Sequence, residues 1–137
     1  MKSIIIIVCI CVILSSFVTW YIFYRPTVRI ENVHFEETDG NVSIVFTVIN
    51  EENRGRQVKY RYSLIEAKSG EEMARGNGTI SLVANGENVV KNVPTITDAE
   101  SYQTYLEHGG SPVIKIAILE NNKIVGEYTG RAKLPSI

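Results

Sequence analysis

Hydrophobic and polar positions divide the chain into one unbroken apolar run and a longer part with a two-residue period. Residues 4–24 carry no charged side chain, and 13 of these 21 residues are Ile, Leu, Val or Phe. As a helix the run would be about 31 Å long, which matches the hydrocarbon core of a bilayer. Helix is favoured there despite the β-branched composition, because a segment in lipid must satisfy its own backbone hydrogen bonds.

The ends of the apolar run resemble those of a retained membrane anchor. Aromatic rings gather at its C-terminal end, where they suit the headgroup layer, and an arginine and Pro26 then end the helix. A cleaved signal peptide would have a shorter apolar stretch followed by small residues. We therefore predict an anchor over residues 1–25 and an extracytoplasmic domain over residues 26–137. The anchor residues that we single out are Ile4, Ile13, Trp20, Tyr21, Tyr24 and Arg25.

From Pro26 onward, apolar and polar residues alternate with the period of half-buried strands. The alternation predicts a strand from Val28 that bulges near Asn32, and it is clearest over residues 58–64. Asn85-Gly86 is the dipeptide preferred in a type I′ hairpin, and it predicts a hairpin between strands 79–84 and 88–93. The other strands are expected at residues 42–49, 73–74, 113–120 and 124–129.

One helix interrupts the strands. Thr97 and Glu100 fit a capping box, and Gly109-Gly110 suits the helix end. About seven short strands with one short helix predict a mostly β protein, an antiparallel, immunoglobulin-like β-sandwich behind the N-terminal transmembrane helix.

Charge and cysteine usage narrow the function classes. Residues 26–137 contain 12 Lys and Arg against 15 Asp and Glu, a net charge of −3, which argues against a nucleic-acid partner. Both cysteines, Cys9 and Cys11, lie in the apolar run, so the domain has neither a disulfide nor a thiolate metal site.

The domain shows no arrangement of residues that predicts catalysis. His34 and His108 are far apart, and no nucleophile elbow, phosphate-binding loop or metal-ligand spacing is present. We expect a non-enzymatic protein with no cofactor and no metal. Two features remain as candidate sites. A basic cluster could contact lipid or a protein partner, and two sequons could be glycosylated at Asn41 and Asn77. The basic cluster consists of Arg54, Arg56, Lys59 and Arg61.

The order of these motifs resembles the late-embryogenesis-abundant type 2 family, also called the WHy domain. The matching elements include Val-Arg-Ile-Glu-Asn-Val at 28–33, a β run that ends at Asn50, Val-Lys-Tyr-Arg-Tyr-Ser-Leu at 58–64 and Met-Ala-Arg-Gly-Asn-Gly at 73–78. The family's Asn-Pro-Asn is replaced here by Asn-Glu-Glu-Asn at 50–53. The resemblance implies a sandwich that protects or binds under stress and implies no catalytic residue.

Two functional hypotheses follow. The first is a membrane-anchored, stress-related binding or protective module on the outer face of a membrane. Its expected partners are the lipid bilayer and other membrane or envelope proteins. The alternative is a structural or accessory subunit of a larger membrane complex or surface filament, which would use its anchor and its strand edges for assembly.

Overall fold

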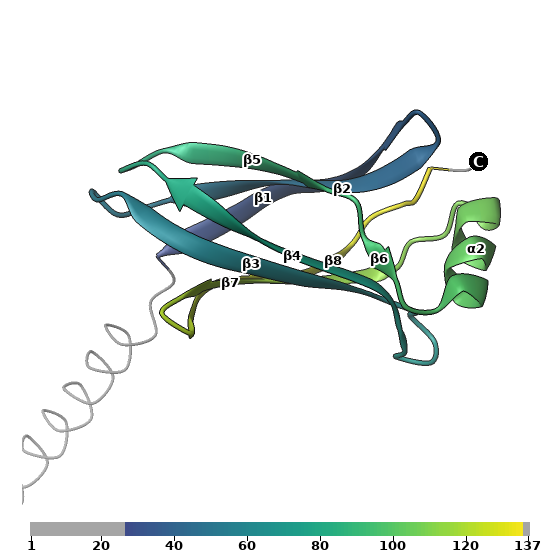
Figure 1. Cartoon of the computed structure of the whole chain (residues 1–137). Helices are drawn as coiled ribbons and strands as arrows, with labels where there is room; N and C mark the ends of the chain where they lie inside the picture. Colours follow the sequence, from purple (N-terminus) through teal and green to yellow (C-terminus); the bar gives the residue numbers. More distant parts are fainter. Residues whose placement is uncertain (1–26, 136–137) are drawn as a thin grey trace, which may run out of the picture.

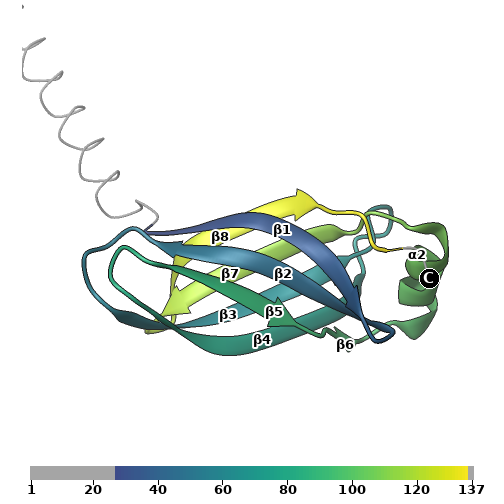
Figure 2. The same ribbon diagram turned by 90° about the horizontal axis from the view of Figure 1, so that it is seen from above.

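Two antiparallel sheets form the body of the molecule, and one helix lies at the end of the sheets farthest from residue 27 (Figures 1 and 2). The computed structural model describes residues 27–135. The sheets have the strand orders β1-β2-β5 and β6-β4-β3-β7-β8. The elements are β1 (Val28–Thr38), β2 (Asn41–Asn50), β3 (Arg56–Ile65), β4 (Glu72–Leu82), β5 (Glu87–Asn92), β6 (Thr95–Ile96), α2 (Ala99–His108), β7 (Val113–Glu120) and β8 (Lys123–Arg131). The mostly β prediction with one short helix is confirmed, with eight strands described where about seven were expected.

The core lies between the two sheets and is built from the inward-facing side chains of the strands other than β6. In β3 the alternation is as the sequence predicts, because Lys59 and Arg61 are exposed and every second side chain is buried. Each fully buried aliphatic or aromatic side chain stabilises the fold by about 1.5–3 kcal/mol before the entropy cost. The largest fully buried side chains of the core are Ile44, Phe46, Leu64, Met73, Ile114, Ile118 and Leu134.

The predicted bulge in β1 is confirmed. The register between β1 and β2 shifts between Glu31 and His34, and Asn32 has a positive φ of 54°. Asparagine tolerates this left-handed conformation better than most residues.

β4 differs from the sequence prediction, because it is one continuous strand rather than a short edge at 73–74 and a separate strand at 79–84. Gly76 and Gly78 weaken the strand pattern in the sequence. In the structure they lie opposite Tyr62 and Tyr60 of β3, and the tyrosine rings cover them. A β-carbon on Gly78 would lie 2.5 Å from the Tyr60 hydroxyl oxygen. The rings therefore fill the space that side chains of β4 would otherwise occupy.

A half-buried asparagine, Asn92, bridges these two tyrosines. The Tyr62 hydroxyl donates to Oδ1 of Asn92 at 2.6 Å, and Nδ2 of Asn92 donates to the Tyr60 hydroxyl at 3.0 Å. Asn92 belongs to β5, so the bridge joins the two sheets. Tyr60 also packs edge-on against Phe46 of β2, with ring centroids 5.7 Å apart. Burial raises the pKa of Tyr62, which keeps its hydroxyl a neutral donor.

The Asn85-Gly86 turn is present, but the predicted hairpin is wrong. The strands on either side of it belong to different sheets, so the turn carries the chain from the five-stranded sheet to the three-stranded one. A type I′ turn needs a positive φ at both central residues, and of this pair only Asn85 has one, at 51°. The β7–β8 hairpin instead has two positive φ values, 51° at Asn121 and 65° at Asn122.

The helix begins one residue later than the sequence predicts. Asp98, and not Thr97, is the cap, and its carboxylate accepts from the Ser101 amide at 3.2 Å. The Thr97 hydroxyl instead donates to the Glu72 carbonyl at 3.2 Å. The predicted helix end is confirmed, because Gly109 has a left-handed conformation with φ 60°.

The predicted anchor at residues 1–25 lies outside the described residues. Within residues 27–135, no helix has the length and apolar character needed to cross a bilayer.

Candidate functional site

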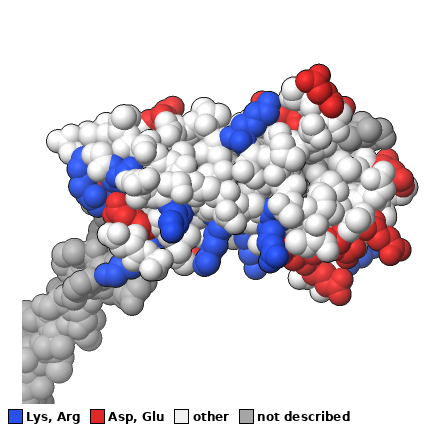
Figure 3. Space-filling model, in the orientation of Figure 1, with Lys and Arg blue, Asp and Glu red and all other residues white. Residues whose placement is uncertain are grey.

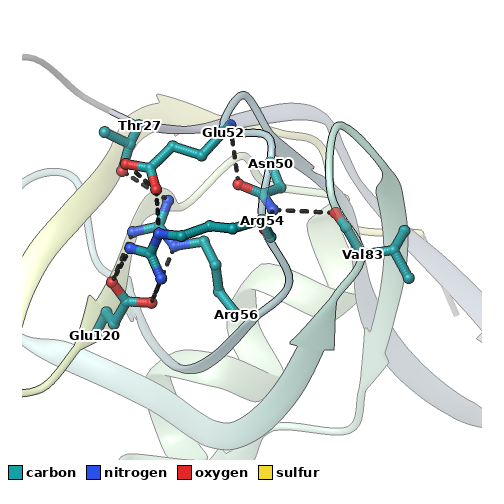
Figure 4. Close-up of polar contacts among 7 residues, drawn as sticks. All are labelled: Thr27, Asn50, Glu52, Arg54, Arg56, Val83 and Glu120. Atoms are coloured by element: carbon teal, nitrogen blue, oxygen red, sulfur yellow. Dashed lines mark hydrogen bonds and ion pairs between the residues drawn. The ribbon is translucent and has the colours of Figure 1, made fainter.

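An ion-pair cluster lies next to Thr27, at the end of the sandwich where β1 begins (Figure 4). Arg56 starts β3, and its guanidinium forms a bidentate pair with Glu120 at the end of β7, with Nε to Oε2 at 3.0 Å and Nη2 to Oε1 at 3.1 Å. Its third nitrogen, Nη1, donates to the Thr27 hydroxyl at 2.8 Å. Only 1% of the Arg56 side chain is exposed. The pair therefore fixes Thr27, the residue before β1, to both strands.

A second arginine completes the cluster from the β2–β3 loop. Arg54 contacts Glu120 through Nη2 at 2.9 Å and Glu52 through Nε at 2.6 Å. The hydrogen bonds from Arg56 and Arg54 lower the pKa of Glu120 from 4.5 to about 2. Glu120 is therefore a fixed carboxylate between two cations, and the arrangement is structural rather than suited to proton transfer.

Asn50 shapes the loop that carries Arg54. Its side chain is buried, its Nδ2 donates to the carbonyls of Arg54 at 2.8 Å and Val83 at 3.0 Å, and its Oδ1 accepts from the Glu52 amide at 3.1 Å. These contacts connect the β2–β3 loop to the β4–β5 turn. Sequence reasoning missed Thr27, Asn50 and Glu120 as members of this cluster, although the buried Asn50 matches the first asparagine of the family pattern.

The predicted basic cluster is split by the fold. Arg56 is buried and paired, so its expected role as an exposed contact residue is wrong, and Arg54 is neutralised by two glutamates. Lys59 and Arg61 point outward from the middle of β3, as expected from their alternation. The side chains that the sequence groups together therefore belong to two separate features.

A shallow groove crosses the outer face of the five-stranded sheet around Lys59 and Arg61. It has two adjoining sections of about 900 and 810 Å³, which share Arg61 and Asn77. Arg75 and Lys115, which flank Ser63 in one row of the sheet, add two more cations, and two carboxylates, Glu72 and Glu127, line the same section. We call these four residues, Lys59, Arg61, Arg75 and Lys115, the cationic face. Among residues 27–135, only Arg75 of this set has a salt bridge, a long one of 3.6 Å to Glu72.

The two sequons occupy different positions. Asn77 lies in the groove directly opposite Arg61, and Thr79 of the same sequon lies opposite Lys59. Asn41 is exposed at the start of β2, whereas Ser43 of its sequon is buried. A glycan on Asn77 would lie over the cationic face.

The histidines are not brought together. His34 lies on β1, where the Asn32 carbonyl and the Glu36 carboxylate raise its pKa, and His108 ends α2. The described part of the chain holds no group of three His, Cys, Asp or Glu side chains placed to bind a metal.

The strands and their order define an antiparallel β-sandwich with a helix at one end of the body, and solved structures share this fold. A β-glucuronidase of glycoside hydrolase family 2 matches with a TM-score of 0.59 and 15% identity, over 79% of this chain and 13% of that one. A family 2 glycosyl hydrolase from Bacteroides cellulosilyticus matches with a TM-score of 0.59 and 12% identity, over 79% and 15%. The chain thus spans only a small part of each enzyme, and identities this low show the fold alone.

A late embryogenesis abundant protein is also similar, with 19% identity and a TM-score of 0.49 over 94% of this chain and 85% of that one. This score does not establish family membership, which stays a prediction. No protein-family model matches the chain, and no curated protein matches its sequence.

Proposed function

We propose that this protein is a non-catalytic binding module, held on the outer face of a membrane by residues 1–25, with an immunoglobulin-like sandwich as its working part. The cationic face is the observation that carries the proposal. The protective, stress-related role that the family resemblance implies belongs to the same proposal, with binding as its physical basis. The immunoglobulin-like arrangement is supported by the strand order, in which β1-β2-β5 packs against β4-β3-β7-β8.

The cationic face suits an anionic region of another membrane or envelope protein. Its cations occupy three successive rows of one sheet, and those in adjacent rows are about 5–10 Å apart. Each exposed ion pair is worth only about 0.2–1 kcal/mol, so charge alone gives weak binding. The amide and hydroxyl groups of Gln57, Asn77 and Thr79, which line the same groove, supply hydrogen bonds to the same partner. Electrostatic attraction then speeds the encounter with the partner, and the hydrogen bonds of the amide and hydroxyl groups give the interaction its specificity.

Photocrosslinking in intact membranes tests this proposal. A photoreactive residue in place of Leu119, which lines the groove opposite Lys59, should capture a defined protein in the full-length chain. The double substitution Lys59→Glu and Arg61→Glu should abolish that capture. Lys68→Glu is the matched control, because Lys68 is exposed in the β3–β4 turn and makes no salt bridge among residues 27–135. Capture that survives reversal of both charges would refute the role of the cationic face.

A subunit of a larger membrane assembly is the second candidate, and the β5 side of the sandwich favours it. β5 pairs only with β2 within the described chain, so its other edge is open. Val89, Val93 and Ile96 expose 71%, 59% and 40% of their surface along this side. An open edge beside exposed aliphatic side chains suits pairing with a neighbouring strand. Mild detergent extraction followed by native gels separates the candidates, because a lone monomer argues against the subunit.

A further inference from the structure

Thr27, the residue just before β1, is held in place by three hydrogen bonds. The Thr27 amide donates to the Val125 carbonyl at 3.1 Å, and the Thr27 carbonyl accepts from the Glu51 amide at 3.1 Å. Its hydroxyl accepts from Arg56 at 2.8 Å. β1 begins at the next residue. The backbone is therefore held by the sandwich from Thr27 onward, and only two residues separate Thr27 from Tyr24, the last residue of the apolar run.

The reach of this connection is short compared with the lipid layer. Three residue steps from Tyr24 to Thr27 span at most about 10 Å. The polar headgroup layer on one side of a bilayer is about 5–8 Å thick. Given the anchor of the proposed function, on which this inference rests, Thr27 lies at or just above the headgroups. Neighbouring loops at the same end must then approach the lipid.

Two exposed aliphatic side chains lie at this end of the sandwich, one in the β4–β5 connection and one at the start of β8. Val83, in the β4–β5 connection, is 64% exposed, and its carbonyl is bonded to Asn50, the cross-strand partner of Val28. Ile124, next to the β7–β8 turn, is 51% exposed, lines one section of the groove and adjoins Val125, whose carbonyl binds the Thr27 amide. Exposed aliphatic side chains at this position suit the boundary between headgroups and acyl chains.

The charges are unevenly distributed along the sandwich. Acidic side chains cover much of the end that carries α2, whereas Lys and Arg lie along the middle and, together with some acidic side chains, toward the opposite end (Figure 3). An anionic lipid surface repels the acidic end and attracts exposed cations. Near Thr27, Lys123 at the start of β8 is exposed, whereas the exposed Arg54 is already paired with Glu52 and Glu120.

We propose that the end of the sandwich around Thr27 is a lipid-contacting face, on which Val83 and Ile124 enter the headgroup layer. The domain then stands upright on the membrane, with α2 pointing away from it. The cationic face lies on the side of the upright body, where a neighbouring membrane protein can reach it.

Lipid-borne quenchers test this orientation in the full-length chain. In a Cys9→Ala, Cys11→Ala background, Val83→Cys, Ile124→Cys and Val93→Cys variants each receive one environment-sensitive fluorophore. Each variant is placed in phosphatidylcholine nanodiscs whose lipids carry a quencher on the headgroup. Val93 is the matched control, because it is exposed to a similar degree but follows the end of β5 that lies away from Thr27.

The expected result is a blue-shifted emission at positions 83 and 124, with headgroup quenching several-fold stronger than at position 93. Equal quenching at all three positions, with the chain inserted in the disc, would overturn the lipid-contacting face and leave the anchor intact. A chain that alkaline carbonate removes from native membranes would overturn the proposed anchor, and the inference with it. Burial of position 93 by protein contacts would shift its emission without adding lipid quenching, so assembly does not imitate the expected result.

Discussion

Glu120→Gln removes the charge that neutralises the buried Arg56 guanidinium while keeping the shape of the side chain. Removing one partner of a fully buried ion pair costs about 3–5 kcal/mol. Here 16% of the Glu120 side chain is exposed and Glu52 lies 3.9 Å from Arg56, so part of the lost interaction is replaced. We expect the substitution to lower the free energy of unfolding by about 2 kcal/mol at neutral pH.

The lowered pKa of Glu120 also predicts how the free energy of unfolding changes with pH. Glu120 has a folded pKa of about 2 against an ordinary value of 4.5, so its ionised form stabilises the folded state above pH 4.5. That stabilisation is lost as the pH falls from 4.5 towards 2, because the unfolded chain then binds the proton more readily. The difference corresponds to about 3 kcal/mol for a fully shielded group, and to about 2 kcal/mol for one that water reaches. More than half of the stabilisation by Glu120 should be lost near pH 3.

Urea denaturation of the full-length chain in mild detergent, followed by circular dichroism between about pH 3 and pH 7, measures both effects. Glu127→Gln is the matched control, because Glu127 is exposed on β8 and makes no salt bridge among residues 27–135. We expect the control to change the unfolding free energy by less than about 0.5 kcal/mol. A wild-type advantage over Glu120→Gln that stays constant from neutral to acidic pH would refute the assigned role of Glu120.

Three further predictions concern packing and titration. Gly78→Ala should destabilise the fold by about 1–3 kcal/mol in urea denaturation, because the added β-carbon displaces a buried tyrosine ring. Gly55→Ala is the control and should be nearly neutral, because the nearest atom to its added β-carbon is 3.5 Å away. Asn92→Ala should cost about 2 kcal/mol in the same assay, because two buried tyrosine hydroxyls lose their partner, and a neutral effect would contradict the bridge. The pKa of His34, measured by NMR titration, should lie above 6.5. It should fall in Glu36→Gln, because the Glu36 carboxylate stabilises the protonated ring. An unchanged pKa in this variant would show that the contact is absent in solution.

The sequence predicts those features that depend on neighbouring residues. The alternation of Tyr60 and Tyr62 with Lys59 and Arg61 shows which side of β3 is buried, because a strand presents successive side chains to opposite faces. The bulge at Asn32 and the left-handed helix end are also local, since each depends on one residue that tolerates a positive φ.

Features that depend on distant contacts could not be predicted. β4 stays continuous through Gly78 only because a ring from β3 covers that glycine. The turn at Asn85 is encoded locally, but the sheet that the next strand joins is decided by its pairing with β2. Arg56 resembles an exposed cation in the sequence, and its carboxylate partner is 64 positions away.

The secure attachment of β1 at Thr27 has a mechanical consequence. Tension between a membrane anchor and a partner held on the five-stranded sheet would pull β1 along its own axis. The hydrogen bonds that pair β1 with β2, from Val28 to Thr38, would then be loaded together in shear rather than opened one after another. With the proposed anchor and partner both attached, the sandwich would resist such tension and would transmit force between them before the domain unfolds.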